Sequence, residues 1–328
     1  MADFPGVRLH VVTGKGGTGK TTVAAALALA LAADGRKVLL TEVEGRQGIA
    51  QLFDTPPLPY EERKVAVAPG GGDLYALAID PEMALLDYLH MFYKLSPNGI
   101  PARTLRRMGA IDFATTIAPG LRDVLLTGKI KEAVVRTHQG RPVYDAVVVD
   151  APPTGRIARF LNISAEMGGL AKVGPIKTQS DGVMQILRSP ATAVHLVTLL
   201  EEMPLQETLD AVVELEALRL PVGGVVVNAV RTPLLSAGDL AAAEAGTLDR
   251  AALALGLKGA GLDASDTLVA VLVAEAQDHA HRVALEERGR DTLAQLAKPT
   301  FELPMLADAI DLGGLYELAA SLREQGLA

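Results

Sequence analysis

Residues 14–22 read Gly14-Lys15-Gly16-Gly17-Thr18-Gly19-Lys20-Thr21-Thr22 and decide the fold class of this chain. They satisfy the phosphate-binding pattern G-x-x-x-x-G-K-[ST], in which backbone N–H groups surround phosphate oxygens. An apolar run over 7–12, VRLHVV, precedes the loop, and an alanine- and leucine-rich stretch follows it until Asp34-Gly35. A strand, a glycine loop and a helix in this order bring a helix N-terminus onto an anion. The stretch therefore predicts a nucleotide-binding loop rather than a simple turn.

The loop carries two lysines, for which we predict different roles. Lys20 is expected to reach the β- and γ-phosphates of ATP, while the Thr21 hydroxyl is expected to ligate Mg²⁺. Lys15 is surplus to the nucleotide that its own loop holds, which indicates a loop that also meets another phosphate chain. The sequence contains one phosphate loop, so a second nucleotide site has to come from another chain.

The composition indicates a soluble globular protein. Of 328 residues, 49% are hydrophobic and 21% are charged, and no segment looks like a transmembrane span or a secretory signal, so we expect a cytoplasmic protein. The net charge of −8 argues against nucleic acid as a partner, because phosphate neutralisation needs a basic face. The absence of cysteine excludes disulfides, iron–sulfur ligation and capture of arsenite through thiols. We interpret the six histidines as structural or surface residues.

Strand and helix patterns alternate along the chain, which is typical of an α/β protein with a doubly wound, mostly parallel sheet. We predict a single P-loop domain over 1–328. Helical inserts are expected at about 81–137, 157–188 and 238–297, and are expected to gather into a helical subdomain where a client or partner binds. Residues 54–73 are rich in proline and glycine and are interpreted as a loop. The expected strands lie at 7–13, 37–43, 74–79, 143–150, 192–199, 222–228 and 299–303.

An aspartate ends the apolar run Val147-Val148-Val149-Asp150. An aspartate at the carboxyl end of a strand, beside a phosphate loop, suits a water-mediated contact with Mg²⁺. The alternative is that Asp150 caps the helix after the Pro152-Pro153 turn. Because the phosphate loop is present, we favour the magnesium contact.

Two carboxylates end the second expected strand, in the segment Thr41-Glu42-Val43-Glu44-Gly45-Arg46. Hydrolysis of a γ-phosphate needs a polar group that orients the attacking water. Glu42 and Glu44 are placed to do this, and Arg46 is placed to balance phosphate charge. The alternative is a pair of exposed glutamates at a strand end.

The loop at 14–22 resembles the deviant Walker A sequence, KGGxGK[ST], of a family of ATPases. That family includes the arsenite-pump ATPase ArsA, the tail-anchored-protein-targeting ATPases, MinD, ParA and the nitrogenase iron protein. Within it, residues 150–161 (DAPPTGRIARFL) are similar to the switch II sequence D-x-A-P-T-G-H-x-x-R-x-L of the ArsA and targeting-ATPase branch. The variant TEVEGRQG over 41–48 resembles switch I of actinobacterial "anion-transporting ATPase" proteins, which often occur as paired paralogues. Further segments fall in the order of that branch, at 119–123, 201–208, 227–228 and 303–306.

This resemblance implies an ATPase that hydrolyses ATP with Mg²⁺ as a dimeric molecular switch coupled to an unknown protein or membrane client. The dimer is expected to be a homodimer or a heterodimer with a paralogous ATPase. Lys15 corresponds to the signature lysine that crosses the dimer interface, and Glu44 to the switch I residue that positions the water; with Lys20 they are the expected catalytic residues. The expected nucleotide contacts are Gly14, Gly16, Gly17, Thr18, Gly19, Lys20, Thr21, Thr22, the adenine-reading Asn228, and Pro304, Met305 and Leu306 of the adenine loop. The expected contacts of Mg²⁺ are Thr21 and, through water, Asp150.

The chain departs from the family pattern at three points. Switch I reads Glu44-Gly45-Arg46-Gln47 where well-studied members have D-P-A-H, and a glutamate is one methylene longer than the aspartate. Arg156 replaces the histidine of switch II. The chain has no cysteine for a zinc clasp or for arsenite, so arsenite pumping is not expected.

Two alternatives to the switch remain. The first is a catalytically weak, nucleotide-binding regulatory subunit that pairs with a catalytic paralogue, and the departures at Glu44 and Arg156 motivate it. The second is a positioning ATPase of the MinD and ParA type, which we favour less, because residues 317–328 lack the basic amphipathic helix of membrane attachment.

Overall fold

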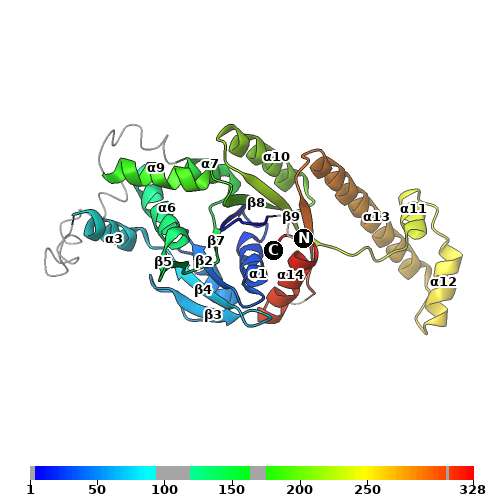
Figure 1. Cartoon of the computed structure of the whole chain (residues 1–328). Coiled ribbons are helices and arrows are strands. Elements are labelled where there is room, and N and C mark those ends of the chain that lie inside the picture. The colour runs from blue at the N-terminus through cyan, green and yellow to red at the C-terminus, as the bar shows by residue number, and fades with distance from the viewer. Residues whose placement is uncertain (1–3, 94–118, 163–174, 308–309) are drawn as a thin grey trace.

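The computed structural model describes residues 4–93, 119–162, 175–307 and 310–328, and Figure 1 shows their arrangement. The centre is an eight-stranded sheet in the order β10-β9-β8-β1-β7-β2-β4-β3. Every neighbouring pair is parallel except β3 and β4. The strands are β1 (Leu9–Gly14), β2 (Lys37–Glu42), β3 (Arg63–Val67), β4 (Asp73–Ala78), β7 (Ala146–Asp150), β8 (Thr192–Thr198), β9 (Val222–Val230) and β10 (Thr300–Pro304), and a separate hairpin joins β5 (Thr137–His138) to β6 (Arg141–Pro142).

Helices cover both faces of this sheet. One buried apolar cluster joins one face to α1, α2 and α14, and a second cluster joins the other face to α3, α6, α7, α9 and α10. The doubly wound α/β architecture predicted from the sequence is therefore confirmed. The helices are α1 (Lys20–Ala32), α2 (Gly48–Leu52), α3 (Pro81–Tyr93), α6 (Pro119–Val135), α7 (Thr154–Leu161), α9 (Pro175–Leu187), α10 (Glu202–Ala217), α11 (Ala237–Glu244), α12 (Arg250–Gly259), α13 (Asp266–Ala294) and α14 (Leu312–Glu324).

Helix α1 packs on β1, β2, β4 and β7 and lies beside α14, which packs on β10 (Figure 1). All its residues from Val23 to Ala32 are buried. A helix that is apolar on every side is stable only inside a core, and its alanines allow close approach of the neighbouring backbones. Because α1 is held on all sides, its first turn, beginning at Lys20, has a fixed position at the end of β1.

The carboxyl ends of five strands meet at one edge of the sheet. Val12 of β1 and Glu42 of β2 both lie in register with Asp150 of β7. On the other side of β1, Gly14 lies in register with Val197 of β8, which itself pairs with β9. The topology therefore brings the phosphate loop together with the segments after β2, β7, β8 and β9. Ligands of open parallel sheets bind at this edge.

All seven strands expected from the sequence are present, within a few residues of the expected bounds. The interpretation of residues 54–73 as a loop is wrong, because this segment contains β3. β3 pairs antiparallel with β4 at the edge of the sheet, and none of its residues is buried. An exposed edge strand needs no continuous apolar run, so its hydrophobic pattern is weak.

The helical inserts lie in two regions (Figure 1). Helices α3, α6 and α9 pack beside one another next to the β4 and β3 side of the sheet. Helices α11, α12 and α13 form an arm at the opposite side, beyond β9 and β10. Residues 94–118 and 163–174 of the first two inserts lie outside the described residues. No described helix is long and apolar enough to cross a membrane.

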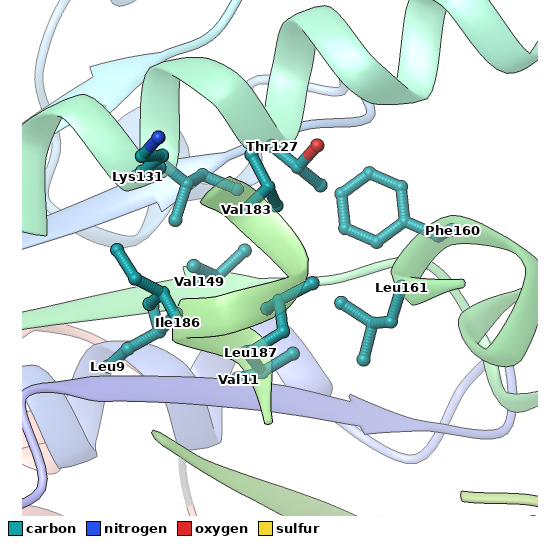
Figure 2. Close-up of a pocket in the computed structure, with 11 residues that line it drawn as sticks. Leu9, Val11, Thr127, Lys131, Val149, Phe160, Leu161, Val183, Ile186 and Leu187 are labelled. Atoms are coloured by element: carbon teal, nitrogen blue, oxygen red, sulfur yellow. The ribbon is translucent and has the colours of Figure 1, made fainter. Parts of the chain in front are cut away.

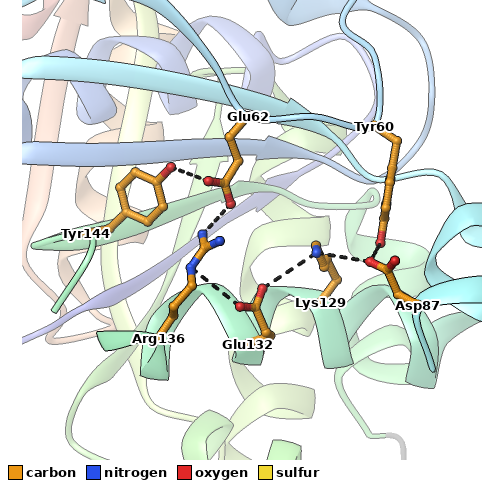
Figure 3. Close-up of polar contacts among 7 residues, drawn as sticks. All are labelled: Tyr60, Glu62, Asp87, Lys129, Glu132, Arg136 and Tyr144. Atoms are coloured by element: carbon orange, nitrogen blue, oxygen red, sulfur yellow. Dashed lines mark hydrogen bonds and ion pairs between the residues drawn. The ribbon is translucent and has the colours of Figure 1, made fainter. Parts of the chain in front are cut away.

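A polar network attaches the first insert to the sheet, as Figure 3 shows. Arg136, the residue directly after α6, forms an ion pair with Glu62, and the Tyr144 hydroxyl donates to the same carboxylate at 2.6 Å. Two turns earlier, within α6, Lys129 contacts Asp87 of α3 at 3.2 Å, and this aspartate accepts a hydrogen bond from Tyr60. Glu132 lies between the two cations, three residues after Lys129 and four before Arg136, and contacts both. The end of α6 is thereby joined to α3 and to the segment before β3.

An apolar contact holds the same helix on its other side. Figure 2 shows side chains of α6, α7 and α9 meeting those of β1 and β7. The space left between them is about 10 Å³, which is at the lower limit for one water molecule of roughly 10–15 Å³. This contact is therefore packed core, and it is too small to bind a ligand. Its lining residues are Leu9, Val11, Thr127, Ile130, Lys131, Val149, Phe160, Leu161, Val183, Ile186 and Leu187.

Two buried histidines join β1 to β8. Nδ1 of His195 accepts a hydrogen bond from the Gly224 N–H at 3.2 Å, so the Nε2–H of His195 donates to Nδ1 of His10 at 3.0 Å. The two ring planes lie within 10° of each other and their centroids are 5.3 Å apart, as expected for rings joined edge to edge by this hydrogen bond. Burial lowers the pKa of His10 to about 4, and burial beside His10 lowers the pKa of His195 well below its usual value. Both rings are therefore neutral in the folded protein, which agrees with the structural interpretation of these two histidines.

We expect the turn between β3 and β4 to depend on glycine at position 72. A β-carbon there would lie 1.6 Å from the carbonyl oxygen of Ala32 and 2.6 Å from that of Arg36. Gly72→Ala should lower the free energy of unfolding in urea by on the order of 3 kcal/mol, because backbone atoms have to shift. Gly256→Ala in α12 is the control: no atom lies within 4 Å, and alanine should raise helix stability by about 0.5–1 kcal/mol. Equal effects of the two substitutions would contradict this account.

The histidine pair predicts a loss of stability in acid. The folded-state pKa of His10 is about 4, below the unfolded value of about 6.5. The unfolded chain therefore binds more protons between these two pH values, and stability falls as the pH drops through this window. From about pH 7 to about pH 5, protonation linked to His10 alone should lower the free energy of unfolding of the wild-type protein by on the order of 2 kcal/mol, and His195 contributes in the same direction. The double variant His10→Gln/His195→Gln should show a shallower pH slope in urea unfolding, and an unchanged slope would contradict this origin.

Candidate nucleotide-binding and hydrolysis site

The phosphate loop joins β1 to α1 and is held by close approach at two glycines. At Gly14, a β-carbon would lie 2.2 Å from the carbonyl oxygen of Val197 on β8. At Gly19, whose φ is +84°, a β-carbon would lie 2.3 Å from Nδ2 of Asn228 on β9. A side chain at either position would push the loop off the neighbouring strand. The two glycines of the motif are therefore needed here for the path of the loop.

Hydrogen bonds fix the inside of the loop. The Thr18 hydroxyl donates to the carbonyl oxygen of Lys15 at 2.9 Å, and the Lys20 ammonium donates to the same oxygen at 3.3 Å. From β9, the amide nitrogen of Asn228 donates to the carbonyl oxygen of Thr18 at 2.9 Å. The tip at 16–17 is exposed to solvent. The backbone turn that would surround a phosphate is thus formed by the protein alone.

Thr21 and Asp150 lie side by side beneath the loop. The Thr21 hydroxyl donates to Oδ2 of Asp150 at 2.7 Å. Burial raises the pKa of Asp150 to about 6, although the Thr21 hydrogen bond and the Lys20 charge lower it. Helix α7 has Pro153 at its N-cap and no side-chain cap. The alternative role of Asp150 as a helix cap is therefore excluded.

These two side chains fit a magnesium ion in their chemistry. Mg²⁺ prefers hard oxygen ligands and is usually held by one or two carboxylates together with phosphate oxygens and water. Thr21 supplies a hydroxyl oxygen and Asp150 a buried carboxylate whose ionised form a cation would favour. In the described ranges, no group of three or more His, Cys, Asp or Glu side chains could hold a metal alone. The remaining ligands would come from the nucleotide and water.

The second lysine of the loop contacts a carboxylate of its own chain. Nζ of Lys15 lies 3.1 Å from Oε1 of Glu207 on α10. Oε2 of Glu207 accepts a hydrogen bond from the Thr154 hydroxyl at 2.9 Å. Burial alone would raise the pKa of Glu207, but the Lys15 and Thr154 hydrogen bonds hold it below its usual value. One glutamate therefore links the phosphate loop to the first residue of α7.

The two glutamates after β2 have different surroundings. Glu42 is buried, and its carboxylate accepts the backbone N–H groups of Gln47 at 2.5 Å and Ile49 at 3.3 Å. Glu44 forms ion pairs with Arg156 at 3.2 Å and Arg46 at 3.4 Å. Glu42 therefore shapes the segment before α2. Glu44 is the carboxylate that remains at the surface of the site.

The predicted adenine contacts lie at the ends of β9 and β10. Pro304 of β10 is in register with Val230, and the Met305 N–H donates to the carbonyl oxygen of Val230 at 2.8 Å. Met305 is 53% exposed. Asn228 lies two residues before Val230, so the structure brings the predicted residues of both segments to one edge. Leu306 follows them and is partly buried.

Sequence reasoning missed three participants of this edge. Glu207, Thr154 and Arg122 all lie in segments that resemble the family, but the sequence predicts no individual role for any of them. Arg122 lies in the first turn of α6 and lines a cavity with Glu44 and Arg156. No local pattern marks these residues, since their partners are far away in the sequence. Thr154, for example, is separated from Glu207 by 53 positions.

The fold and the site define a P-loop nucleotide-binding protein of the doubly wound α/β class. Residues 7–187 match the model of the family described as "Anion-transporting ATPase", and the chain belongs to this family. The resemblance drawn from the loop and the switch segments is thereby confirmed. Membership in an ATPase family supports ATP binding and hydrolysis as the class of activity.

Several proteins are similar to the chain over long stretches. ATPase BagA of Mycobacterium tuberculosis is 58% identical over 323 residues, covering 98% of this chain and 94% of the relative. The Escherichia coli arsenical pump-driving ATPase is 29% identical over 258 residues, covering 74% of this chain and 42% of the relative. ATPase get3 of Schizosaccharomyces pombe is 29% identical over 183 residues, covering 53% and 51%. The similarity to the mycobacterial ATPase thus spans nearly the whole chain.

We expect Asn228 to brace the loop for any nucleotide. Asn228→Ala removes the hydrogen bond to Thr18, which should weaken binding of both ADP and GDP by roughly tenfold in calorimetric titrations. If the substitution weakens binding of ADP more than binding of GDP, the difference measures how much Asn228 contributes to recognition of adenine. Asn162→Ala, at the C-terminal end of α7, is the matched control. A loss confined to ADP would contradict the bracing role.

Proposed function

We propose that the chain is an ATP-driven dimeric switch, which hydrolyses ATP with Mg²⁺ and couples nucleotide state to the binding of a protein or membrane client. The contact of Lys15 with Glu207 carries the proposal. Nζ of Lys15 contacts a carboxylate on α10, and in the switch it would exchange this partner for the phosphates of a second nucleotide. Because the sequence contains one phosphate loop, the second nucleotide belongs to another subunit, either an identical chain or a paralogue.

The residues of the site divide the work of hydrolysis. Lys20 neutralises charge on the β- and γ-phosphates, and its pKa, lowered by burial, marks it as a desolvated cation. Thr21 and Asp150 would hold Mg²⁺, which when bound neutralises phosphate charge. Glu44 accepts a proton of the attacking water and orients it toward the γ-phosphate. For this, one oxygen of Glu44 has to leave Arg156 or Arg46.

Glu207 couples the nucleotide to the helices. When Lys15 moves to the nucleotide of the other subunit, Glu207 loses one of its two partners, and its hold on Thr154 changes with it. Thr154 begins α7, which packs against α10 on one side and α6 on the other. A shift of α7 therefore reaches α6 and the first helical insert. This route connects hydrolysis to the region where we expect a client to bind.

A second candidate is a regulatory subunit that binds ATP without hydrolysing it, paired with a catalytic paralogue. The ion pairs of Glu44 with both Arg156 and Arg46 favour it, because they occupy the carboxylate that water activation needs. Under this hypothesis the purified chain binds ATP and releases no phosphate above background. Hydrolysis by the purified chain, lost in Lys20→Ala, supports the switch instead.

Lys15→Ala should abolish turnover and leave nucleotide binding intact. Loss of one cation that contacts the transition state typically costs roughly 100-fold or more in rate. ATP binding is measured by calorimetry and turnover by phosphate production. Lys258→Ala, in the last turn of α12, is the control. Full turnover in Lys15→Ala would reject the role of this lysine.

Mixing two inactive variants tests whether Lys15 acts across a dimer. Lys15→Ala keeps its own phosphate loop, and Lys20→Ala keeps Lys15. In a mixed dimer, Lys15 of the second variant completes the site of the first, which should restore about a quarter of the wild-type rate for random pairing. No restored activity, with mixed dimers shown by mass, would mean that Lys15 acts on the nucleotide of its own chain.

A further inference from the structure

A polar cavity of about 270 Å³ opens between the segment after β2, the start of α6 and the start of α7. Its volume is below the range of roughly 300–1,000 Å³ that is usual for drug-sized ligands. It is therefore a space for a small ion rather than for a second nucleotide. Its lining residues are Val43, Glu44, Arg46, Arg122, Asp123, Leu126, Pro152, Arg156 and Phe160.

Three arginines face this cavity from three segments of the chain. Arg46 follows β2, Arg122 lies in α6 and Arg156 lies in α7. The lining also contains two carboxylates, Glu44 and Asp123. Three guanidinium groups and two carboxylates leave one positive charge in excess. An anion that entered the cavity would balance it.

The three arginines differ in how their charge is balanced. Glu44 contacts Arg156 at 3.2 Å with one oxygen and Arg46 at 3.4 Å with the other. Arg122 is half-buried and has no hydrogen bond or ion pair to another side chain within the described ranges. A guanidinium has five N–H donors and binds oxyanions through two parallel hydrogen bonds. The guanidinium of Arg122 is thus available to bind an anion, whereas Glu44 would compete with that anion for Arg46 and Arg156.

Two helix N-termini add to the positive potential. Arg122 is the fourth residue of α6 (Pro119–Val135), and Arg156 is the third residue of α7 (Thr154–Leu161). The first turn of a helix carries partial positive charge and favours anions. Both first turns reach the same cavity, so arginine charge and helix dipoles point to the same kind of ligand.

We propose that Arg46, Arg122 and Arg156 form a second anion site, which binds inorganic phosphate beside and separately from the nucleotide loop. A tetrahedral oxyanion offers an oxygen to each of three convergent guanidinium groups. Glu44 lines the cavity and lies within electrostatic range of Lys20 and Asp150. Phosphate cleaved from ATP would therefore have a short path into the site.

The phosphate has two possible sources, and only one of them rests on the proposed function. The first is the γ-phosphate released by hydrolysis, which would pass through this cavity on leaving. The second is phosphate from solution, which needs no hydrolysis by this chain. A neighbouring cavity of about 380 Å³ shares Val43, Glu44 and Arg122 with the first and extends along the segment before α3. It offers a route between the site and solvent.

The direct test is calorimetric titration of inorganic phosphate into the full-length chain saturated with Mg²⁺ and ADP. Phosphate should bind the wild-type protein at millimolar concentrations or below. Arg122→Gln should weaken binding at least about tenfold, because it removes a charged bidentate donor. Arg122→Lys should recover part of the loss as a point charge. Glu44→Gln should strengthen binding several-fold, since it releases Arg46 and Arg156 from their carboxylate partner.

Controls separate this site from the nucleotide loop and from loss of folding. Arg250→Gln, at the exposed first residue of α12, should bind phosphate as the wild-type protein does. Melting temperatures of all variants should remain close to the wild-type value. The proposal is overturned if the wild-type protein binds no phosphate. It is also overturned if Lys20→Ala abolishes binding while Arg122→Gln leaves it unchanged, because the phosphate then occupies the nucleotide site.

Single-turnover kinetics identifies the source of the phosphate. Chemical quenching measures cleavage of ATP, and a phosphate-binding reporter measures release. A changed interval between the two in Arg122→Gln identifies the product of hydrolysis as the ligand of the site. An unchanged interval, together with weakened binding in the titration, identifies phosphate from solution. The titration needs no hydrolysis, so failure of the proposed ATPase switch and failure of the anion site give different results.

Discussion

The close approach of the phosphate loop to β8 and β9 is the constraint on which the site depends. Gly14 and Gly19 lie where any β-carbon would meet the backbone of Val197 or the side chain of Asn228. The path of the loop therefore depends on the strand order, because β8 has to lie next to β1 and β9 next to β8. On the other side, β7 brings Asp150 to Thr21. The topology of the sheet thus positions both the loop and its carboxylate.

Two ion pairs connect the loop and the segment after β2 to α7. Lys15 reaches α7 through Glu207 and Thr154, and Glu44 reaches it through Arg156. These side chains are partly exposed, and exposed ion pairs contribute only about 0–1 kcal/mol each. Interactions of this strength can be replaced by contacts with a nucleotide without loss of the fold. Weak, branched ion pairs at the edge of a rigid sheet suit a protein whose conformation depends on its ligand.

Much of the fold was predictable because the strands are buried on both faces and appear as short apolar runs. The edge strand β3 was missed, since it is exposed and follows a proline-rich segment. At the site, motif and spacing indicated the lysines, Thr21 and Asp150 as candidates, and the structure brings Thr21 and Asp150 into contact. Glu207 and Arg122 were not, because their roles arise from neighbours in space. No sequence pattern indicates a functional role for Arg122, because that role depends on a cavity formed by α6, α7 and the segment after β2.

The sequence by itself determined the phosphate loop, the alternation of strands and helices, and the family, because each depends on local spacing and hydrophobic period. Only the tertiary structure decided that Lys15 contacts Glu207, that His195 donates to His10, and that three arginines share a cavity. These contacts join residues up to 192 positions apart, as for Lys15 and Glu207. Their distances depend on how the helices cover the sheet, and no local pattern records that packing. The phosphate-binding pattern is therefore recognisable in nine consecutive residues, whereas the proposed switch and the proposed anion site depend on contacts that only the fold creates.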